Sequence, residues 1–309
     1  MVNNGIISVT YDKKRLKGNF VTETTIKFPS LFQREGQHKS NTVVAKVYES
    51  TTEGKHCDYK YPASIFLHHI RNELDMIEDA GAIMASGVLQ QAGTIAVLHM
   101  PHYGDRKEDG EDFLNKDYSK FRQNFAQLIL DAHVLRVALA EMPKVDSQNI
   151  SLSGISLGAV LGLTVSAFDQ GFSRYAKLVG GGNLSNILAN RAQNRPESEV
   201  ALALKGSVIE EAAIRSEIAA VDPIVWAHRI KNKKVFMLNA TRDDIVDYTK
   251  SVKPVVEILK INGNQIEQIL NEDEHVPTGS GLKKLKKVFL PMLKFIVADK
   301  PSVQSTCSQ

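Results

Sequence analysis

Ser156 is the residue whose surroundings most clearly indicate chemistry. It is the central residue of GISLG at positions 154–158, a G-x-S-x-G pattern that follows the apolar run 150–152 and leads into the small, aliphatic residues 159–161. This order predicts a strand, a sharp turn and a helix, which would expose the serine hydroxyl at the positive end of the helix dipole. Glycines flank the turn because larger side chains would clash there. A serine presented in this way can act as a nucleophile.

A serine hydroxyl is a weak nucleophile on its own, so it needs a base and a group that orients the base. Asp243 follows the predicted strand 234–238, and His275 follows the last predicted strand, 265–270. Serine, aspartate and histidine then occur in an order along the chain that is compatible with acyl transfer. The other eight histidines lack this combination of position and order, and a lone histidine is more often structural.

Short strands separated by helices must position these residues. The runs 63–67, 94–98 and 150–152 are short and mostly apolar, as buried parallel strands in βαβ units are. One long helix is predicted from apolar residues spaced four and three apart: Phe121, Phe125, Leu128, Ala132, Leu135, Leu139 and Met142. Residues 1–50 alternate β-rich runs with polar turns, which predicts antiparallel strands. The pattern indicates an α/β fold with a mostly parallel, doubly wound sheet.

The second half of the chain continues this alternation. A further strand is predicted at 175–179, and a closing helix at 281–298 with a kink at Pro291. The segment 184–222 is rich in Ala, Glu and Leu, and we expect it to be a helical insertion that serves as a partial lid. The small, polar tail 301–309 is expected to fray. The whole chain, 1–309, is predicted to be one domain.

These motifs together resemble the α/β-hydrolase superfamily, most closely its dienelactone-hydrolase-like and acetyl-esterase-like branches. The resemblance runs from about residue 42 to the closing helix and implies the α/β-hydrolase fold. In these branches a G-x-x-D-x-x-V/P segment supplies the acid, and the spacing from Ala240 to Asp243 is similar. Asp244 and Asp247 are rivals for this role, because a change of register by one residue would select Asp244. A solvated loop with a helix N-cap is the alternative reading of this acidic cluster.

The resemblance also implies where an oxyanion would be bound. The segment 61–70, YPASIFLHHI, is similar to the superfamily's strand that ends in His-Gly, whose following loop donates an N–H group. His69 stands where glycine is usual, so the N–H of Ile70 is the first choice and that of His69 the second. The N–H of Leu157 is the expected second donor. Each such donor can contribute ~3 kcal/mol to stabilising the transition state.

Substrate contacts are expected from loops at the carboxyl ends of the parallel strands, where such folds form their binding crevice. The segment 100–106, MPHYGDR, is similar to the superfamily's Pro-x-x-Gly loop. His102 and Tyr103 are therefore predicted to contact substrate, and His68 is predicted to border the same pocket. The alternative is that the glycine of this loop only makes a turn.

Composition and missing motifs exclude several other classes of protein. The chain has 309 residues, 43% hydrophobic and 24% charged, with a net charge of +3, which is typical of a globular protein and not of a disordered or fibrous one. Scattered basic residues predict no nucleic-acid partner. The absence of a long apolar stretch predicts no membrane association, and the polar amino terminus predicts a cytoplasmic protein, or a periplasmic or secreted one if a signal peptide was removed.

No motif for a metal or a cofactor is complete. The triple glycine at 180–182 does not extend to G-x-G-x-x-G, and His68-His69 lacks an H-E-x-x-H partner. Cys57 and Cys307 fit no metal-ligand spacing and could be reduced thiols or one disulfide. We therefore expect neither a metal nor a cofactor.

The hypothesis from sequence is a serine hydrolase that cleaves small-molecule carboxylic esters through an acyl-enzyme, with Ser156, His275 and Asp243 as its catalytic residues. A peptidase or a thioesterase would use the same three residues. The alternative from another class is a non-catalytic binding module that keeps the fold. The presence of all three residues and of both glycines favours the enzyme.

Overall fold

The computed structural model describes residues 10–15, 21–50, 60–69, 78, 81–82, 93–115, 117–198, 201–202, 211–272, 274–275 and 285–297. The predictions for Ile70, for Cys57 and Cys307 and for the tail 301–309 concern residues outside these ranges. None of the helices within these ranges has both the length and the apolar character that a bilayer span requires.

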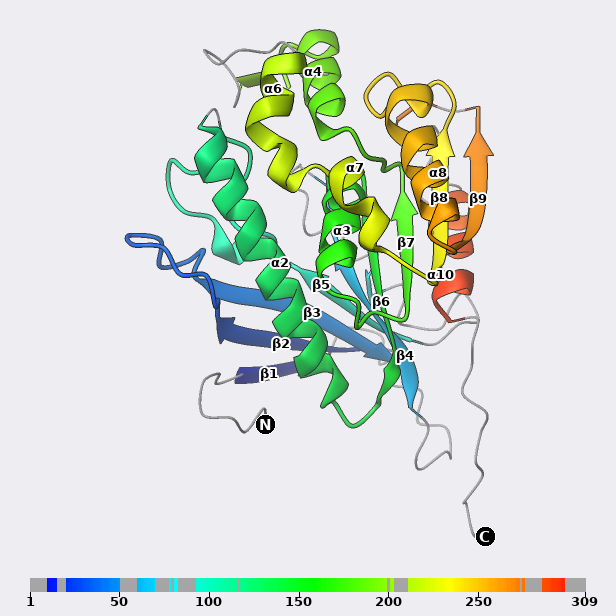
Figure 1. Ribbon diagram of the computed structural model, residues 1–309. Helices are drawn as coiled ribbons and strands as arrows, with labels where there is room; N and C mark the ends of the chain where they lie inside the picture. The colour runs from blue at the N-terminus through cyan, green and yellow to red at the C-terminus, as the bar shows by residue number, and fades with distance from the viewer. Residues whose placement is uncertain are drawn as a thin grey trace, which may run out of the picture.

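Nine strands in the described part of the chain form one sheet, in the spatial order β1-β2-β3-β5-β4-β6-β7-β8-β9 (Figure 1). They are β1 (Thr10–Arg15), β2 (Val21–Pro29), β3 (Thr42–Ser50), β4 (Tyr61–Leu67), β5 (Thr94–Leu98), β6 (Val145–Ile155), β7 (Arg174–Leu178), β8 (Lys234–Ala240) and β9 (Gln265–Asn271). In this spatial order, the pairs β1–β2, β2–β3 and β3–β5 are antiparallel. The remaining pairs, from β5–β4 to β8–β9, are parallel. The predicted sheet, mostly parallel with antiparallel amino-terminal strands, is confirmed.

The burial of each strand explains its sequence. All five residues of β5 are buried, and in β4 only the first residue is partly exposed, which accounts for their continuous apolar runs. At the edge of the sheet, β9 has no fully buried residue. The central strands therefore position side chains most firmly, and β4 and β6, which pair with each other, lie among them.

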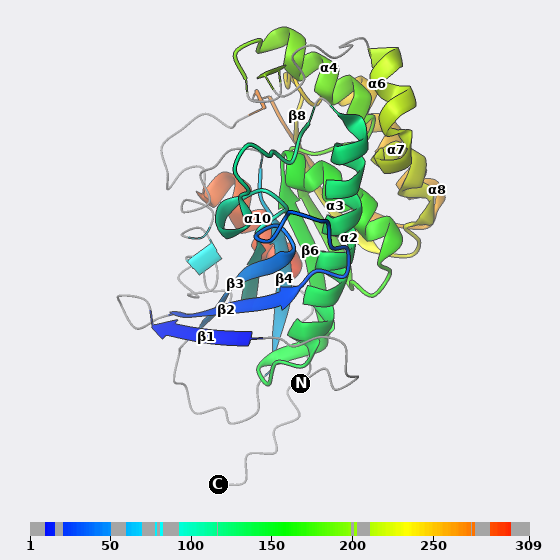
Figure 2. The same ribbon diagram turned by 90° about the vertical axis from the view of Figure 1, so that its left-hand side faces the viewer.

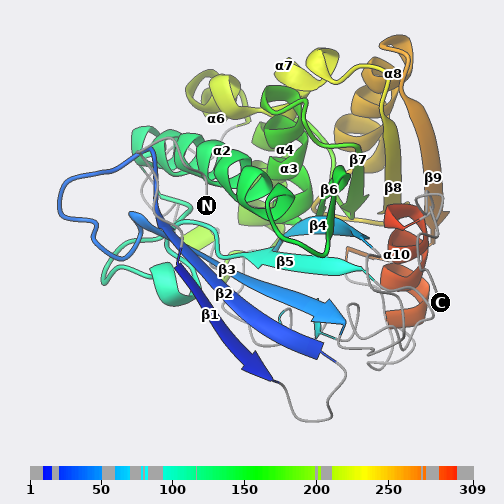
Figure 3. The same cartoon turned by 90° about the horizontal axis from the view of Figure 1, so that it is seen from below.

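Helices cover both faces of the sheet (Figures 2 and 3). One face carries α2 (Tyr118–Ala140), α3 (Leu157–Phe168) and α8 (Lys253–Ile261), and the opposite face carries α10 (Leu290–Ile296). The predicted apolar stripe of α2 is buried, and the helix begins at Asp117, whose carboxylate accepts hydrogen bonds from two backbone N–H groups. Two separate hydrophobic clusters, one on each face, thus hold the sheet.

Most of the described part of the segment 184–222 is helical, and residues 195–198 form a turn after its first helix. It contains α4 (Leu184–Asn194), α6 (Glu211–Ile218) and the short η2 (Ala219–Val221). Helices α4 and α6 lie at the top in Figure 1. The buried Asp222 carboxylate joins the two ends of the segment, because it accepts N–H groups at the start of α4 and that of Ile224 in α7 (Pro223–Trp226). Burial nevertheless raises the pKa of Asp222.

The closing helix differs from the prediction. Its described part is a π-helical turn, η5 (Leu285–Phe289), followed by α10. Pro291 is the second residue of α10, which continues η5 without a break. The irregularity therefore precedes the proline and is a change of helix type, not a kink at Pro291. The remaining short helices are η1 (Gly104–Arg106), η3 (Ala227–Arg229) and the π-helical η4 (Tyr248–Val252).

Candidate active site

Ser156 occupies the sharp turn between β6 and α3. Its backbone has a φ of 51° and a ψ of −119°, a conformation that residues with a Cβ rarely adopt. The turn is held by backbone hydrogen bonds: Ser156 N–H donates to the carbonyl of Leu178 at 2.9 Å, and the carbonyl of Ser156 accepts from Ala159 and Val160 at 3.0 Å. Such strain persists only where the surroundings over-determine it, and it is common at functional sites.

The two glycines beside this turn are required by close packing of backbone on backbone. A Cβ on Gly154 would lie 2.5 Å from the carbonyl oxygen of Gly158, and one on Gly158 would lie 2.1 Å from that of Leu67, at the end of β4. Real Cβ atoms essentially never approach other atoms within 3.0 Å. Any side chain at position 154 or 158 would therefore clash with backbone, as the G-x-S-x-G pattern predicts.

A continuous chain of hydrogen bonds joins the three predicted catalytic residues. Ser156 Oγ lies 2.9 Å from His275 Nε2, and His275 Nδ1 lies 2.7 Å from Asp243 Oδ2. The second carboxylate oxygen, Asp243 Oδ1, accepts N–H groups from Ile245 at 2.9 Å and Val246 at 2.8 Å. Because a carboxylate only accepts, Nδ1 of the imidazole carries the proton and Nε2 presents its lone pair to the serine hydroxyl.

The two rival aspartates point elsewhere. The carboxylate of Asp244 pairs with Arg195 at 2.9 Å, and that of Asp247 accepts the N–H of Lys250 at 2.6 Å at the start of η4. Asp243 is also the most deeply buried of the three. Of the three candidates, only Asp243 lies within hydrogen-bond distance of His275.

His68 joins the ends of β4 and β5. Its ring is fully buried, and burial lowers its pKa to about 3, so the ring is neutral at physiological pH. Nδ1–H donates to the carbonyl of His69 at 2.7 Å, and Nε2 accepts the N–H of Met100 at 3.2 Å. Both ring nitrogens are thus bonded to backbone groups, and the predicted role of His68 at the border of the substrate pocket stays a prediction.

The expected oxyanion donors lie around the same turn. Leu157 is the first residue of α3, where a backbone N–H has no acceptor within the helix. His69 is the second residue after the end of β4, and its carbonyl accepts a hydrogen bond from the ring of His68. Ile70 lies outside the described residues. Whether His69 or Ile70 donates the N–H that would act together with that of Leu157 therefore stays a prediction.

His102 and Tyr103 are both buried and contact other parts of the protein. His102 has a φ of 64°, and its Nε2 lies 3.0 Å from Arg34 Nη2 and 3.1 Å from Asn124 Oδ1. Burial, and then the charge of Arg34, lower the pKa of His102 to about 4. The ring of Tyr103 stacks edge-on against His68, with 4.8 Å between centroids. These contacts are within the protein, so the substrate contacts predicted for His102 and Tyr103 stay predictions.

The loop that carries His102 is held by charged residues that the sequence did not single out. Arg106 is fully buried and donates to Asp131 Oδ2 at 2.8 Å and to the carbonyl of His99 at 2.9 Å. Ser30 Oγ donates to the other oxygen of Asp131 at 2.6 Å. Nothing in the spacing of these residues indicates that they meet, because their pairing depends on how α2 packs against the loops.

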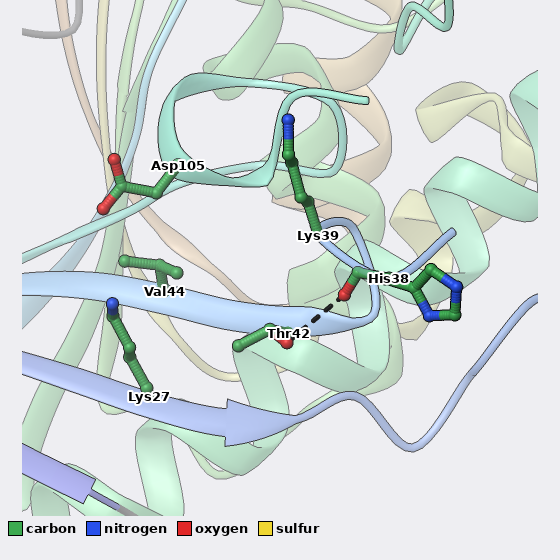
Figure 4. A pocket seen from close by; sticks show the side chains of 6 residues that line it. All are labelled: Lys27, His38, Lys39, Thr42, Val44 and Asp105. Atoms are coloured by element: carbon green, nitrogen blue, oxygen red, sulfur yellow. Dashed lines mark hydrogen bonds between the residues drawn. The ribbon is translucent and has the colours of Figure 1, made fainter. Parts of the chain in front are cut away.

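A surface hollow of about 440 Å³ lies at the antiparallel edge of the sheet (Figure 4). It is lined by Lys27, His38, Lys39, Thr42, Val44 and Asp105. The side chains of His38, Lys39 and Asp105 point in different directions and not towards a common point. The hollow shares no lining residue with the Ser156 site. Among the residues that the structure describes, no group of three or more side chains could hold a metal ion.

No protein-family model matches the sequence, and a comparison with curated proteins found no match. Solved structures do match. An acetyl xylan esterase from Paenibacillus sp. R4 is 15% identical, with a TM-score of 0.64 over 95% of this chain and 88% of the esterase. Acetyl xylan esterase 1 from Thermoanaerobacterium sp. JW/SL YS485 is 18% identical, with a TM-score of 0.58 over 93% of this chain and 88% of the other.

A third match is a Klebsiella pneumoniae protein described as a dienelactone hydrolase. It is 14% identical, with a TM-score of 0.55 over 94% of this chain and 98% of the other. At such low identities a structural likeness establishes the fold and leaves the activity to be argued from the site. The strand order, the strained turn at Ser156 and these matches agree, and the chain therefore has the α/β-hydrolase fold.

Proposed function

We propose that the protein is a serine hydrolase that cleaves carboxylic esters of small molecules through an acyl-enzyme intermediate. The observation that carries this proposal is the hydrogen-bonded chain from Ser156 Oγ through His275 to Asp243, with contacts of 2.9 and 2.7 Å. The strained turn at Ser156 adds support, because a strained backbone there has no evident use except to present the hydroxyl.

In the proposed first step, Ser156 Oγ attacks the carbonyl carbon of the ester while His275 Nε2 takes the hydroxyl proton. The carbonyl π electrons move to oxygen, and the N–H of Leu157 stabilises the resulting oxyanion together with that of Ile70 or His69. The tetrahedral intermediate then expels the alcohol, which receives the proton from His275. Asp243 keeps the imidazole in the required tautomer and stabilises its positive charge.

The second step repeats the first with water as the nucleophile. His275 takes a proton from water as its oxygen attacks the acyl carbon, and Ser156 leaves with that proton when the carboxylic acid is released. Neither step calls for a metal or an organic cofactor. The reaction therefore consumes one ester and one water and returns an alcohol and an acid.

Several of the matched structures favour esters as the substrate class, although a Pyrococcus horikoshii acylaminoacyl peptidase also matches, with 13% identity and a TM-score of 0.57. Those described above are two acetyl xylan esterases and a dienelactone hydrolase, and a cold-adapted esterase from an Arctic intertidal metagenomic library also matches, with 13% identity and a TM-score of 0.58. A peptidase or a thioesterase would use the same residues, so a panel of esters, thioesters and amides with matched acyl groups is needed to separate the three activities.

The test is turnover of p-nitrophenyl esters of increasing acyl length by the wild type and by Ser156→Ala. Removing the nucleophile of such a set lowers kcat by ~10⁶-fold, so we expect no measurable turnover by the variant while it keeps the wild-type thermal unfolding curve. Turnover by the variant close to that of the wild type would overturn the proposal.

A further inference from the structure

Helix α4 presents a row of asparagines to the loop that carries Asp243. Asn186, Asn190 and Asn194 are spaced four residues apart, so they lie along one face of the helix. Asn194 Nδ2 donates to the carbonyl of Asp244 at 3.0 Å, and Asn190 Nδ2 donates to that of Ile245 at 3.4 Å. Asn186 Oδ1 accepts from Ser251 Oγ at 3.3 Å. We call these three residues the asparagine row.

The bonds of the asparagine row reach the same backbone that positions the acid. Ile245 is bonded on both sides: its N–H donates to Asp243 Oδ1 at 2.9 Å, and its carbonyl accepts from Asn190. Asp243 Oδ1 is thus fixed by the loop, and this leaves Oδ2 to face His275 at 2.7 Å. A shift of the loop backbone would therefore move the carboxylate relative to the imidazole.

The start of α4 is packed against η4, which follows the Asp243 loop directly along the chain. Gly182 N–H donates to the carbonyl of Ser251 at 2.8 Å, and Asn183 Nδ2 donates to that of Lys250 at 3.2 Å. A Cβ on Gly181 would lie 2.7 Å from the carbonyl oxygen of Ser251 and 3.3 Å from Val246. Helix α4 thus contacts η4 at its start and the Asp243 loop in its second half.

We propose that Asn190 and Asn194 are positioning residues, which hold the loop so that Asp243 meets His275, and that α4 is a fixed support of this loop and not a moving lid. The proposal rests on the proposed function, since it assigns these residues a role in the same reaction. Any movement of the predicted lid segment 184–222 is then restricted to the part that follows α4.

The test removes both amides with the double variant Asn190→Ala and Asn194→Ala. Alanine is a better helix former than asparagine, so α4 itself is not weakened. Misplacing a catalytic group by about 1 Å can cost ~100-fold in rate. We expect a smaller displacement of the Asp243 carboxylate from His275, which would lower kcat roughly tenfold and leave KM within about twofold of wild type. The matched control is Gln193→Ala, which removes an exposed carboxamide from the same turn that makes no hydrogen bond within the described residues.

A second readout does not depend on turnover. The proton of His275 Nδ1, held by Asp243, should give a low-field proton NMR resonance in the wild type and in Gln193→Ala, and the resonance should weaken or broaden in the double variant. Should the wild type hydrolyse no ester, this loss of the resonance still supports the positioning role while the proposed function fails.

Two outcomes would overturn the proposal. One is a folded double variant that keeps both the wild-type kcat and the resonance. The other is an increase in KM with an unchanged kcat, which would mean that α4 acts on substrate entry. If the double variant does not fold, Asn194→Ala alone serves, because Asn194 is exposed and its replacement leaves the core intact. It should lower kcat about threefold, and wild-type kcat with an intact resonance in this variant overturns the proposal equally.

Discussion

Ser156 and Asp243 are held by different kinds of contact. The turn at Ser156 is fixed by backbone packed on backbone, with glycines at 154 and 158 where no side chain fits. The loop at Asp243 is fixed by side chains that reach its backbone from α4. A single added atom at these glycines disrupts the packing, whereas the hydrogen bonds from α4 can be removed one at a time. We therefore expect one substitution at the turn to cause a large loss of stability, and substitutions in α4 to lower kcat in small steps.

After the loss of the nucleophile itself, the largest expected effect comes from replacing the acid. Asp243→Asn keeps the shape of the side chain but lets it donate, so the imidazole is no longer held in the tautomer that accepts the serine proton, and kcat should fall about 10⁴-fold. Asp244→Asn is the matched control, because it changes a neighbouring carboxylate that pairs with exposed Arg195, and kcat should stay within about twofold. Equal losses in the two variants would contradict the assignment of the acid.

The next effect concerns the packing of the turn. Gly158→Ala places a Cβ 2.1 Å from the carbonyl oxygen of Leu67, and we expect the free energy of unfolding to fall by about 3 kcal/mol, because the atom that it meets belongs to the backbone of a central strand. Gly36→Ala is the contrast: its φ is 73° but nothing lies within 4 Å of the added atom, so the cost is limited to about 1 kcal/mol. Urea unfolding of both variants measures the difference. A Gly158→Ala protein as stable as Gly36→Ala would show that the turn can relax.

A buried lysine behind the turn gives the third test. Lys177 of β7 is fully buried, and its Nζ has no hydrogen-bond partner among the described residues. The amine packs against Gly162 of α3 so closely that a Cβ on this glycine would lie 2.6 Å from Nζ. Burial lowers the pKa of Lys177 from 10.5 to about 7. Between these values the unfolded chain binds more protons than the folded one, so this lysine makes stability rise with pH from about 7 to 10.5.

Lys177→Met should therefore raise the free energy of unfolding at neutral pH by a few kcal/mol, because an apolar side chain of similar length replaces an unpaired amine. The variant should also lose the rise in stability between pH 7 and 10. Lys260→Met, at an exposed position of α8, should change neither quantity. Unfolding curves measured at several pH values decide this, and an unchanged pH dependence in Lys177→Met would show that the amine is solvated or paired.

The features that sequence could predict are those set by local pattern. The apolar runs of β4 and β5 are buried on both faces of the sheet. Gly154 is required by the backbone of Gly158, which lies only four residues further along the chain. The spacing of apolar residues in α2 likewise follows from the geometry of one helix. Each of these can be inferred without knowing what packs against it.

The features that sequence could not predict depend on packing between distant segments. Asp243 and Asp244 differ by one position, and only the fold of the loop decides which faces His275. His68 and His102 are buried by loops that meet after folding, so their polar partners were not foreseen. The spacing of the asparagine row is visible in the sequence, but the backbone that it contacts lies about 50 residues away along the chain.

Whether Ser156 is an activated nucleophile can be measured by covalent labelling. The folded protein is treated with a fluorophosphonate probe, which reacts with activated serines, and the modified residue is identified by peptide mapping. We expect the probe to modify Ser156 in the folded protein and to leave it unmodified after denaturation, because the hydrogen bond to His275 is then lost. Failure of the folded protein to react at Ser156, or equal reaction at other serines, would contradict the assignment of Ser156 as the nucleophile.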